Sequence, residues 1–376
     1  IKGLKLKGAF TYFYSTGFSD TFEKSYKLYD YDANTDTYNV VADFPSIYRW
    51  RSQSTNEDIT SQVSLSYDKV FANVHKLSAF VGSETYTHST PGWSLASSPL
   101  TNSMKKIYFE DITGYGDRGE NTEARAGFMG RVNYEYDNRY LFEFAARYDG
   151  SWKFPPKHRW GFFPSVSGGW RVSEEKFWNE DLKSIFSNLK LRASYGVVGD
   201  DNISGYSAFD YLSGYNYASG GAVLDGEWVP GSSARNLPVT HFSWIKATMA
   251  DVGFDVGFFN NQLTGSFDLF RRLRKNLPAS RYDKVLPSEI GFGLPVENLN
   301  SDMTKGLDWA IAWQSNIGDF NYTIGGNMTF ARSYNWHQYK PRFSNSRDYF
   351  VYSAHERVAG ATWALDCIGQ FQNWEE

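Results

Sequence analysis

The chain has 376 residues, a formal net charge of −4, a pI near 5.9 and a mean hydropathy of −0.50. Aromatic residues make up 18% of it, and Tyr outnumbers Trp, as is typical of membrane barrels with aromatic girdles. The acidic balance argues against a nucleic-acid surface, and the single cysteine, Cys367, excludes an internal disulfide framework. No run of about 18 apolar residues exists, so a transmembrane helix is excluded.

Alternation of apolar and polar residues predicts about eleven strands, each with one apolar face. In chain order they are centred on residues 4–14, 63–67, 77–81, 124–136, 140–148, 162–172, 189–195, 252–258, 263–269, 307–313 and 320–330. Within residues 124–136, Phe128 and Val132 lie on one face and Arg131 and Glu135 on the other. Several segments reach the roughly 10 residues that a membrane-spanning strand needs, whereas strands of soluble sandwiches average about 5–6. The pattern therefore predicts an all-β fold, a transmembrane antiparallel barrel with a polar interior.

The connections between these strands alternate in length. Short ones are predicted near residues 69–74, 137–139, 260–262 and 318–319, and long ones at 16–57, 89–120, 151–160, 200–245, 276–305 and from 334 onward. Residues 174–188 take a short-side position with room for one helical turn. A transmembrane barrel has this asymmetry, with tight turns on the periplasmic side and long loops outside, whereas a soluble meander has no reason for it.

Several phrases, in order, resemble the barrel of the SusC/RagA-type TonB-dependent transporters. Residues 130–173 read GRVNYEYDNRYLFEFAARYDGSWKFPPKHRWGFFPSVSGGWRVS, and residues 189–202 read LKLRASYGVVGDDN. The phrases that follow are Asn236-Leu237-Pro238 with Trp244, the stretch 259–270, and Asn298 with Lys305-Gly306; the opening 26–38 (YKLYDYDANTDTY) fits as well. The resemblance spans nearly the whole chain and is specific as an ordered set.

The resemblance implies a 22-stranded barrel in the outer membrane of a Gram-negative bacterium, of which residues 1–376 would be about half, as a single barrel domain. It implies an N-terminal plug domain, a SusD-like surface lipoprotein as cap, and energy from the TonB complex. The implied activity is active import of an oligosaccharide or oligopeptide, without catalysis or a cofactor. A homodimer of transporter–lid pairs is a further implication. We expect the full protein to extend beyond this sequence, because half a barrel would leave unpaired strand edges in lipid.

Aromatic residues in the predicted long loops are the candidate ligand contacts, because an aromatic ring offers its face to the apolar face of a sugar or to a peptide side chain. They are Trp93, Tyr115, Tyr211, Tyr215, Tyr217 and Trp228. The alternative interpretation is packing within the loops or against the capping lipoprotein. Aromatic residues at strand ends are instead expected to be girdle anchors: Tyr12, Tyr14, Tyr134, Tyr136, Tyr140 and Tyr148.

Three weaker motifs have simpler interpretations. Asp30, Asp32, Asn34 and Asp36 have the alternate-oxygen spacing of a calcium loop but lack its glycine and final glutamate, so a polar hairpin turn is expected and no metal site. Residues 114–119 match G-x-G-x-x-G without a strand–helix context, so a flexible loop is expected. A catalytic acid/base pair needs two carboxyl groups that face each other across the bond to be cleaved. The adjacent carboxylates at 174–175 and 200–201 therefore do not establish such a pair.

Three alternative functions stay open. A siderophore or cobalamin receptor would share the fold without a lipoprotein cap, and the ordered phrases argue against it. A SusC-like barrel could serve as a scaffold in a larger envelope assembly. A soluble carbohydrate-binding or hydrolytic β-protein would not need the strand lengths or the alternating connections.

Overall fold

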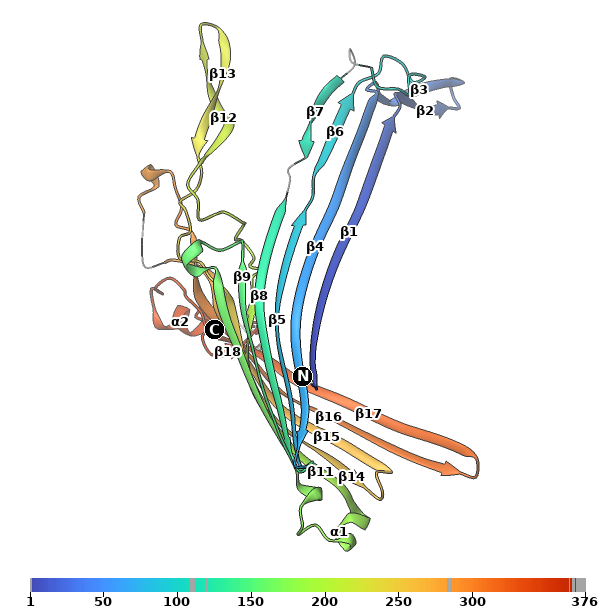
Figure 1. Cartoon of the computed structure of the whole chain (residues 1–376). Coiled ribbons are helices and arrows are strands. Elements are labelled where there is room, and N and C mark those ends of the chain that lie inside the picture. The colour runs from blue at the N-terminus through green and yellow to red at the C-terminus, as the bar shows by residue number, and fades with distance from the viewer. Residues whose placement is uncertain are drawn as a thin grey trace. The chain divides into compact units, whose positions relative to one another are not determined.

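The computed structural model describes residues 2–108, 112–118, 121–282, 284, 286–364, 366 and 369 (Figure 1). They are mostly antiparallel β-strands, with two short helices, α1 (Glu180–Ile185) and α2 (Ser346–Tyr352). Contacts divide the chain into two compact units: unit 1 is 1–6, 64–82 and 127–376, and unit 2 is 7–63 and 83–126. Within the described part of the chain, neither helix has the length and apolar character needed to cross a membrane.

Eleven long strands match the eleven predicted segments. They are β1 (Leu4–Glu23), β4 (Tyr48–Phe71), β5 (His75–Ser89), β8 (Thr122–Tyr136), β9 (Tyr140–Ser151), β10 (Trp160–Arg171), β11 (Phe186–Asp200), β14 (Ile245–Phe258), β15 (Leu263–Ser280), β16 (Val296–Ile317) and β17 (Phe320–His337). In the sheet they follow the order β17-β16-β15-β14-β11-β10-β9-β8-β5-β4, with β1 beside β4. The predicted antiparallel all-β architecture is confirmed.

The short connections lie where they were predicted. Ala72 with Asn73 and Asp137 with Asn138 have positive φ values, between 47° and 59°, so each pair makes a tight hairpin turn. Asn and Asp tolerate this conformation better than most side chains because their short polar groups bond locally. Residues 174–188 hold α1, so the predicted helical turn is confirmed as well.

The long connections are shorter and more ordered than predicted. β1 continues to Glu23 and β4 begins at Tyr48, so the predicted connection 16–57 was too wide. The additional strands are β2 (Tyr26–Asp32), β3 (Thr37–Phe44), β6 (Gly92–Ser97), β7 (Ile112–Arg118), β12 (Tyr215–Leu224), β13 (Glu227–Ala234) and β18 (Arg357–Val358). One signal was present in the sequence: Asp225-Gly226, both at positive φ, turns β12 into β13, and Asp-Gly is a strong hairpin signal.

Two of the long connections pack on each other to form a buried loop core in unit 1. Its members are Phe154, Phe163, Ile203, Tyr206, Phe242, Trp244 and Ile245. The rings of Tyr206 and Phe242 stack with centroids 4.4 Å apart, and burial raises the pKa of the Tyr206 hydroxyl. Trp244 Nε1 donates to the Arg159 carbonyl at 3.0 Å. The loops at this end of β9, β10, β11 and β14 are therefore held in place by apolar burial.

The strands of unit 1 present one apolar face that no other layer of the described chain covers. Phe142, Phe162, Tyr195, Val252 and Phe330 are all more than 40% exposed. Monomeric soluble proteins rarely expose contiguous apolar patches of more than a few hundred Å², so this face requires an apolar surrounding such as lipid. The opposite face carries the aspartates of β14 and β15 with their arginine partner, Arg192.

Aromatic rings gather at both ends of this exposed face, as expected for girdle anchors. Toward the short turns, Tyr140 stacks with Tyr136 and with Trp170 at 6.2 and 6.5 Å. Toward the long connections, Tyr148 stacks with Trp160 at 4.9 Å. Tyr140 and Tyr148 are eight residues apart on β9, which corresponds to about 27 Å along the strand and roughly 21 Å across a membrane at the usual tilt. This separation approaches the apolar band of about 25 Å in membrane barrels.

Glu175 holds the short-turn end of β9 and β10 together. Its carboxylate accepts hydrogen bonds from Tyr140 Oη at 2.6 Å, Trp170 Nε1 at 3.0 Å and Arg139 Nη1 at 2.9 Å. These donors favour the ionised form, and the Tyr140 bond most strongly lowers the pKa of the Glu175 carboxyl. The adjacent Glu174 is exposed.

Replacing Phe154 by Ala should open the loop core without unfolding the strands. Phe154 is fully buried, so the loss should be about 3–5 kcal/mol of local stability. We expect faster protease cleavage within residues 152–244 of the full-length protein in outer-membrane vesicles. Tyr217→Ala, at a side chain 90% exposed, is the control and should leave cleavage unchanged. Equal cleavage rates in both variants would contradict a packed loop core.

Replacing Glu175 by Ala should destabilise the folded protein at neutral pH, because three donors lose their acceptor. Because the pKa of this carboxyl is lowered by folding, its contribution is present above the unfolded value of about 4.3 and is lost as the pH falls through the folded value. Urea unfolding of the full-length protein in lipid vesicles at several pH values measures this. Glu174→Ala serves as the matched control; a difference between the variants that is independent of pH would contradict the role of the ionised carboxylate.

Candidate functional site

An ion network occupies the inner, charged face of β11, β14 and β15. Arg192 Nη2 lies 2.9 Å from both Asp255 and Asp268, and Arg192 Nε donates to both oxygens of Asp255 at 3.1 Å. Asp308 lies directly across from Asp268 in the ladder, so a further carboxylate shares the face. One guanidinium thus stands among several carboxylates, and charge-assisted bonds of this kind are among the stronger hydrogen bonds in proteins.

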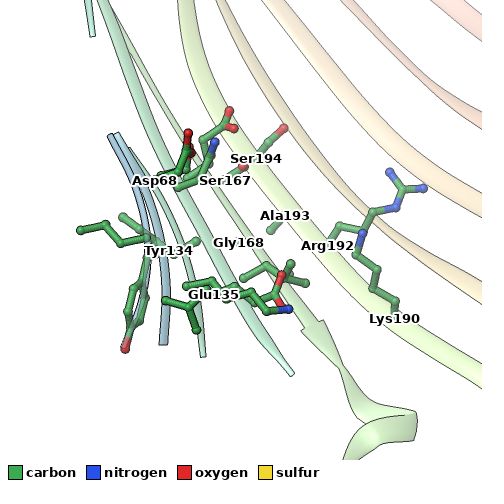
Figure 2. Close-up of a pocket in the computed structure, with 18 of the residues that line it drawn as sticks. Asp68, Tyr134, Glu135, Ser167, Gly168, Lys190, Arg192, Ala193 and Ser194 are labelled. Carbon is green, nitrogen blue, oxygen red and sulfur yellow. The ribbon is translucent and has the colours of Figure 1, made fainter. Parts of the chain in front are cut away.

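Two open hollows lie along this inner face. The first, of about 740 Å³, is lined by residues of β4, β5, β8, β9, β10 and β11, including Asp68, Glu135, Glu143, Lys190 and Arg192 (Figure 2). Figure 2 shows the neighbours Tyr134 and Glu135 on opposite sides of β8, as a period of two requires. Lys76 Nζ and Glu135 Oε1 pair at 2.6 Å in this hollow.

The second hollow, of about 960 Å³, continues along the same face toward the long connections. Its charged lining includes Glu143, Arg147, Asp149, Asp251, Arg271 and Asp308. Arg147 Nη2 lies 2.8 Å from Asp149 Oδ1. Both hollows carry positive and negative groups side by side, so this face can bind a polar solute or a polar protein surface through either sign of charge.

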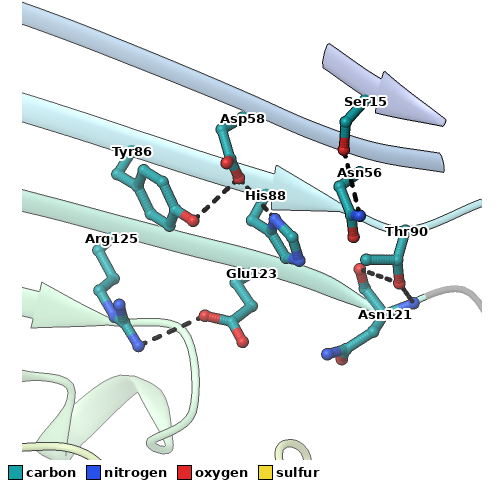
Figure 3. A network of polar contacts seen from close by, with 9 residues as sticks. All are labelled: Ser15, Asn56, Asp58, Tyr86, His88, Thr90, Asn121, Glu123 and Arg125. Carbon is teal, nitrogen blue, oxygen red and sulfur yellow. Dashed lines mark hydrogen bonds and ion pairs between the residues drawn. The ribbon is translucent and has the colours of Figure 1, made fainter. Parts of the chain in front are cut away.

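Unit 2 has its own polar network (Figure 3). Asp58 on β4 accepts a hydrogen bond from Tyr86 Oη at 3.0 Å and lies 2.5 Å from His88 Nδ1, both on β5. Arg125 Nη2 and Glu123 Oε2, on β8, are 3.4 Å apart. Asp58 bonds across neighbouring strands and Glu123 pairs with Arg125 within β8, which gives these residues a structural role in the sheet.

Three predicted ligand contacts lie on one face of the β12–β13 hairpin. Tyr217 pairs with Ser232, Tyr215 with Ala234 and Trp228 with Val223, and the bulge between Tyr217 and Gly221 leaves the three aromatic side chains on the same face by register. All three are more than 60% exposed. A Cβ at Gly221 would lie 2.5 Å from the Trp228 ring, so only glycine lets this ring cover the strand.

The other three predicted contacts lie elsewhere. Trp93 and Tyr115 share one face of the β6–β7 pair by register, and Trp93 Nε1 donates to Gln53 Oε1 at 3.2 Å. Tyr115 is 82% exposed. Tyr211 is half-buried, with its ring 6.2 Å from that of Phe209. Ligand contact by any of the six stays a prediction.

The candidate calcium loop is the tip of the β2–β3 hairpin. Asp32 Oδ1 accepts from the Asn34 N–H at 2.9 Å, which lowers the pKa of Asp32, and Asp36 Oδ1 accepts from Tyr31 Oη at 2.8 Å. Asp30 lies on β2, opposite Asn39. No cluster of His, Cys, Asp or Glu suited to a metal ion occurs among the described residues.

The G-x-G-x-x-G phrase falls on a strand, and the adjacent carboxylates Asp200 and Asp201 accept local hydrogen bonds. Residues 114–118 of the G-x-G-x-x-G phrase lie in strand β7, so the flexible loop expected for them was wrong. Gly119 lies outside the described residues. Asp201 Oδ2 accepts from Ser151 Oγ at 2.7 Å, and Asp200 Oδ1 accepts from the Asn202 N–H at 2.8 Å. Each carboxylate of this pair bonds to its own local donor. Cys367 lies outside the described residues.

Comparison with known proteins identifies the family. Residues 4–375 match the family model "TonB dependent receptor-like, beta-barrel". The chain belongs to this family. Localisation in the outer membrane of a Gram-negative bacterium follows, and the exposed apolar face of the strands agrees with it. The predicted SusC/RagA resemblance is confirmed by the relatives and structures that follow.

Two curated relatives have similar sequences. TonB-dependent receptor SusC of Bacteroides thetaiotaomicron is 32% identical over 290 residues, and TonB-dependent receptor P3 of Formosa agariphila is 29% identical over 278 residues. Each alignment covers 73% of this chain and 27% of the relative, so the chain matches about a quarter of their length.

Solved structures share the fold. "Structure of the RagAB peptide transporter" superposes with a TM-score of 0.71 at 21% identity, covering 89% of this chain and 35% of that one. "Structure of the RagAB peptide importer in the 'open-open' state" gives a TM-score of 0.75 at 20% identity, covering 92% and 36%. At these identities the likeness concerns the fold.

Replacing Arg192 by Met should lower the unfolding free energy by about 1–2 kcal/mol. This is the low end for a charge-assisted network, because screening water reaches 30% of the Arg192 side chain, 33% of Asp255 and 19% of Asp268. Asp268→Asn in the Arg192→Met background should recover part of this loss, since it removes one uncompensated carboxylate. A double-mutant cycle by urea unfolding in lipid vesicles gives the coupling. Additive losses would mean that the two side chains do not interact in the folded protein.

Proposed function

We propose that the full-length protein is a TonB-dependent importer of the SusC/RagA type, which takes up an oligosaccharide or an oligopeptide across the outer membrane. The observation that carries the proposal is the separation of the two sheet faces: an exposed apolar outer face and an inner face with two charged hollows. A wide barrel with a polar interior admits a polar solute and needs a plug to prevent leakage. Because the outer membrane holds no ATP, transport against a gradient needs energy from the TonB complex.

A SusD-like lipoprotein is the proposed partner on the outer surface. The β12–β13 hairpin supports this, since an isolated two-stranded hairpin is at best marginally stable in water. It presents Tyr215, Tyr217 and Trp228 on one face. The hairpin forms its own two-stranded sheet, apart from the long strands (Figure 1). Exposed Tyr and Trp are enriched at binding interfaces. The pairing of two transporter–lid units into a homodimer stays a prediction.

The two proposed substrate classes differ in which groups of this chain would bind them. A glycan would stack on exposed rings, with Tyr115 and Tyr217 as the most accessible. A peptide would use the mixed charges of the inner face, such as Lys190 and Glu143, for its termini and side chains. Absence of catalysis is also part of the proposal, because the matched family is one of receptors.

The combined variant Tyr215→Ser, Tyr217→Ser and Trp228→Ser should weaken capture of the lipoprotein, because the loss of three exposed rings removes most of the apolar contact of the hairpin. We expect co-purified lipoprotein from detergent-solubilised outer membranes to fall at least about tenfold. Tyr349→Ser and Tyr352→Ser, exposed side chains of α2, are the matched controls.

Uptake of labelled oligosaccharide and oligopeptide pools by cells carrying either variant separates the two roles of the hairpin. Loss of uptake with the lipoprotein retained would make the rings substrate contacts. Full uptake and full capture would contradict both roles. Two results together would favour a scaffold role over import. A strain that lacks the gene would take up both pools normally, and the full-length protein from wild-type cells would purify within a large envelope assembly.

A further inference from the structure

Three basic side chains lie in direct register on the apolar outer face of the sheet. Arg271 on β15 pairs with Lys305 on β16, and Lys305 pairs with Arg332 on β17. All three are exposed. Direct cross-strand neighbours have Cβ atoms about 4.5–5.5 Å apart, and like charges in such positions repel each other. An uncompensated row of three positive charges therefore lowers stability unless an anion binds to it.

The row faces the same side as the apolar residues of these strands. Leu269 and Phe330 lie two residues from Arg271 and Arg332, so the period of two places them on one face with the basic groups. An open hollow of about 660 Å³ is lined by this set, together with Val252, Tyr334 and one aspartate, Asp251, whose position in the ladder belongs to the inner face. The hollow thus joins a positive rim to an apolar floor.

No carboxylate of the described chain pairs with these three groups. Arg271 instead contacts Met303 Sδ at 3.1 Å and lies over the Trp336 ring at 5.7 Å, and Lys305 lies over the Tyr334 ring at 4.9 Å. On the inner face of the sheet, by contrast, Arg192 of β11 and Arg274 of β15 have aspartate partners.

Acidic residues are confined to the inner face across this region. The register of β14, β15 and β16 places all their aspartates on the inner face, at positions 251, 255, 268, 302 and 308. On the outer face, beyond the pair of Thr248 and Leu273 toward the long connections, Lys246 and Lys275 pair and are basic too. The outer face of these strands therefore has only positive charges to offer to its surroundings.

The row lies at the headgroup level of the outer leaflet. Arg271 is eight residues from the turn end of β15 at Leu263, and Arg332 is twelve from the turn end of β17 at Phe320. At the usual strand rise and tilt these spans correspond to roughly 21 and 31 Å across the membrane. They lie on either side of the far edge of an apolar band of about 25 Å, on the side away from the short periplasmic turns.

We propose that Arg271, Lys305 and Arg332 bind the phosphate groups of an anionic glycolipid of the outer leaflet, whose acyl chains lie against Leu269, Val252 and Phe330. The complementarity is of charge and of polarity: phosphate at the positive rim, hydrocarbon on the apolar floor. Arginine and lysine both bind phosphate, arginine through its planar fork and lysine as a point charge. The bound lipid removes the repulsion within the row and fastens this side of the barrel to the leaflet. This site needs the outer-membrane location but not the proposed import.

Titration of the delipidated, detergent-purified full-length protein with lipopolysaccharide, and separately with its chemically dephosphorylated form, tests the proposal. The triple variant Arg271→Gln, Lys305→Gln, Arg332→Gln should lower the affinity for lipopolysaccharide by roughly a hundredfold, at about a factor of five for each cation near an anionic surface. The dephosphorylated lipid should bind wild type and variant equally weakly.

A matched triple variant controls for the loss of positive charge. Lys176→Gln and Lys183→Gln remove charges at the short-turn end, and Arg272→Gln removes one from the inner face beside Arg271. This variant should bind lipopolysaccharide like wild type. Equal affinity of the outer-face variant and wild type would overturn the proposal, as would equal losses in both triple variants. A change of oligomeric state or of a co-purifying protein, with lipid affinity intact, would make the row a protein contact and would also overturn it. Urea unfolding of each variant in vesicles separates lost binding from lost folding.

Discussion

The structure depends on one constraint, which is that a chain in hydrocarbon must satisfy every backbone N–H and C=O within itself. Each unpaired group would cost several kcal/mol in the absence of water. Long antiparallel strands meet the constraint by pairing with their sequence neighbours, as in the run β14-β15-β16-β17. With the backbone fixed in this way, every second side chain faces lipid and the others face the interior. The two chemistries of this protein follow from that alternation.

The inner face is built for polarity and the outer face for hydrocarbon. Arg192 is held by Asp255 and Asp268 where water and solutes can reach it. On the outer face of the neighbouring strands β9 and β10, Tyr140 and Trp170 stack near one edge of the apolar band. A one-residue slip of any strand would exchange these faces, which is why the register is strongly specified. Charge on the outer face is acceptable only near the headgroups, where Arg271, Lys305 and Arg332 lie.

The loop core shows how the end of the sheet opposite the short turns is organised. Phe154, Tyr206, Phe242 and Trp244 bury apolar surface between two connections that would otherwise be independent. Ordered loops can present a fixed surface, and the β12–β13 hairpin extends from one of them. Rigid support beneath exposed aromatic rings reduces the entropy lost when a partner or a substrate binds.

Sequence alone determined the eleven long strands, the short turns and the polarity of each face. Period-two patterns such as Phe128 and Val132 against Arg131 and Glu135 depend only on local geometry, so all eleven long strands could be predicted. Tertiary structure decided what the long connections do, because the contact of Phe154 with Tyr206 or Trp244 joins segments far apart in the chain and has no local pattern. It also decided which charges meet: the row of Arg271, Lys305 and Arg332 exists only once the register of three strands is set, and register is a property of paired strands.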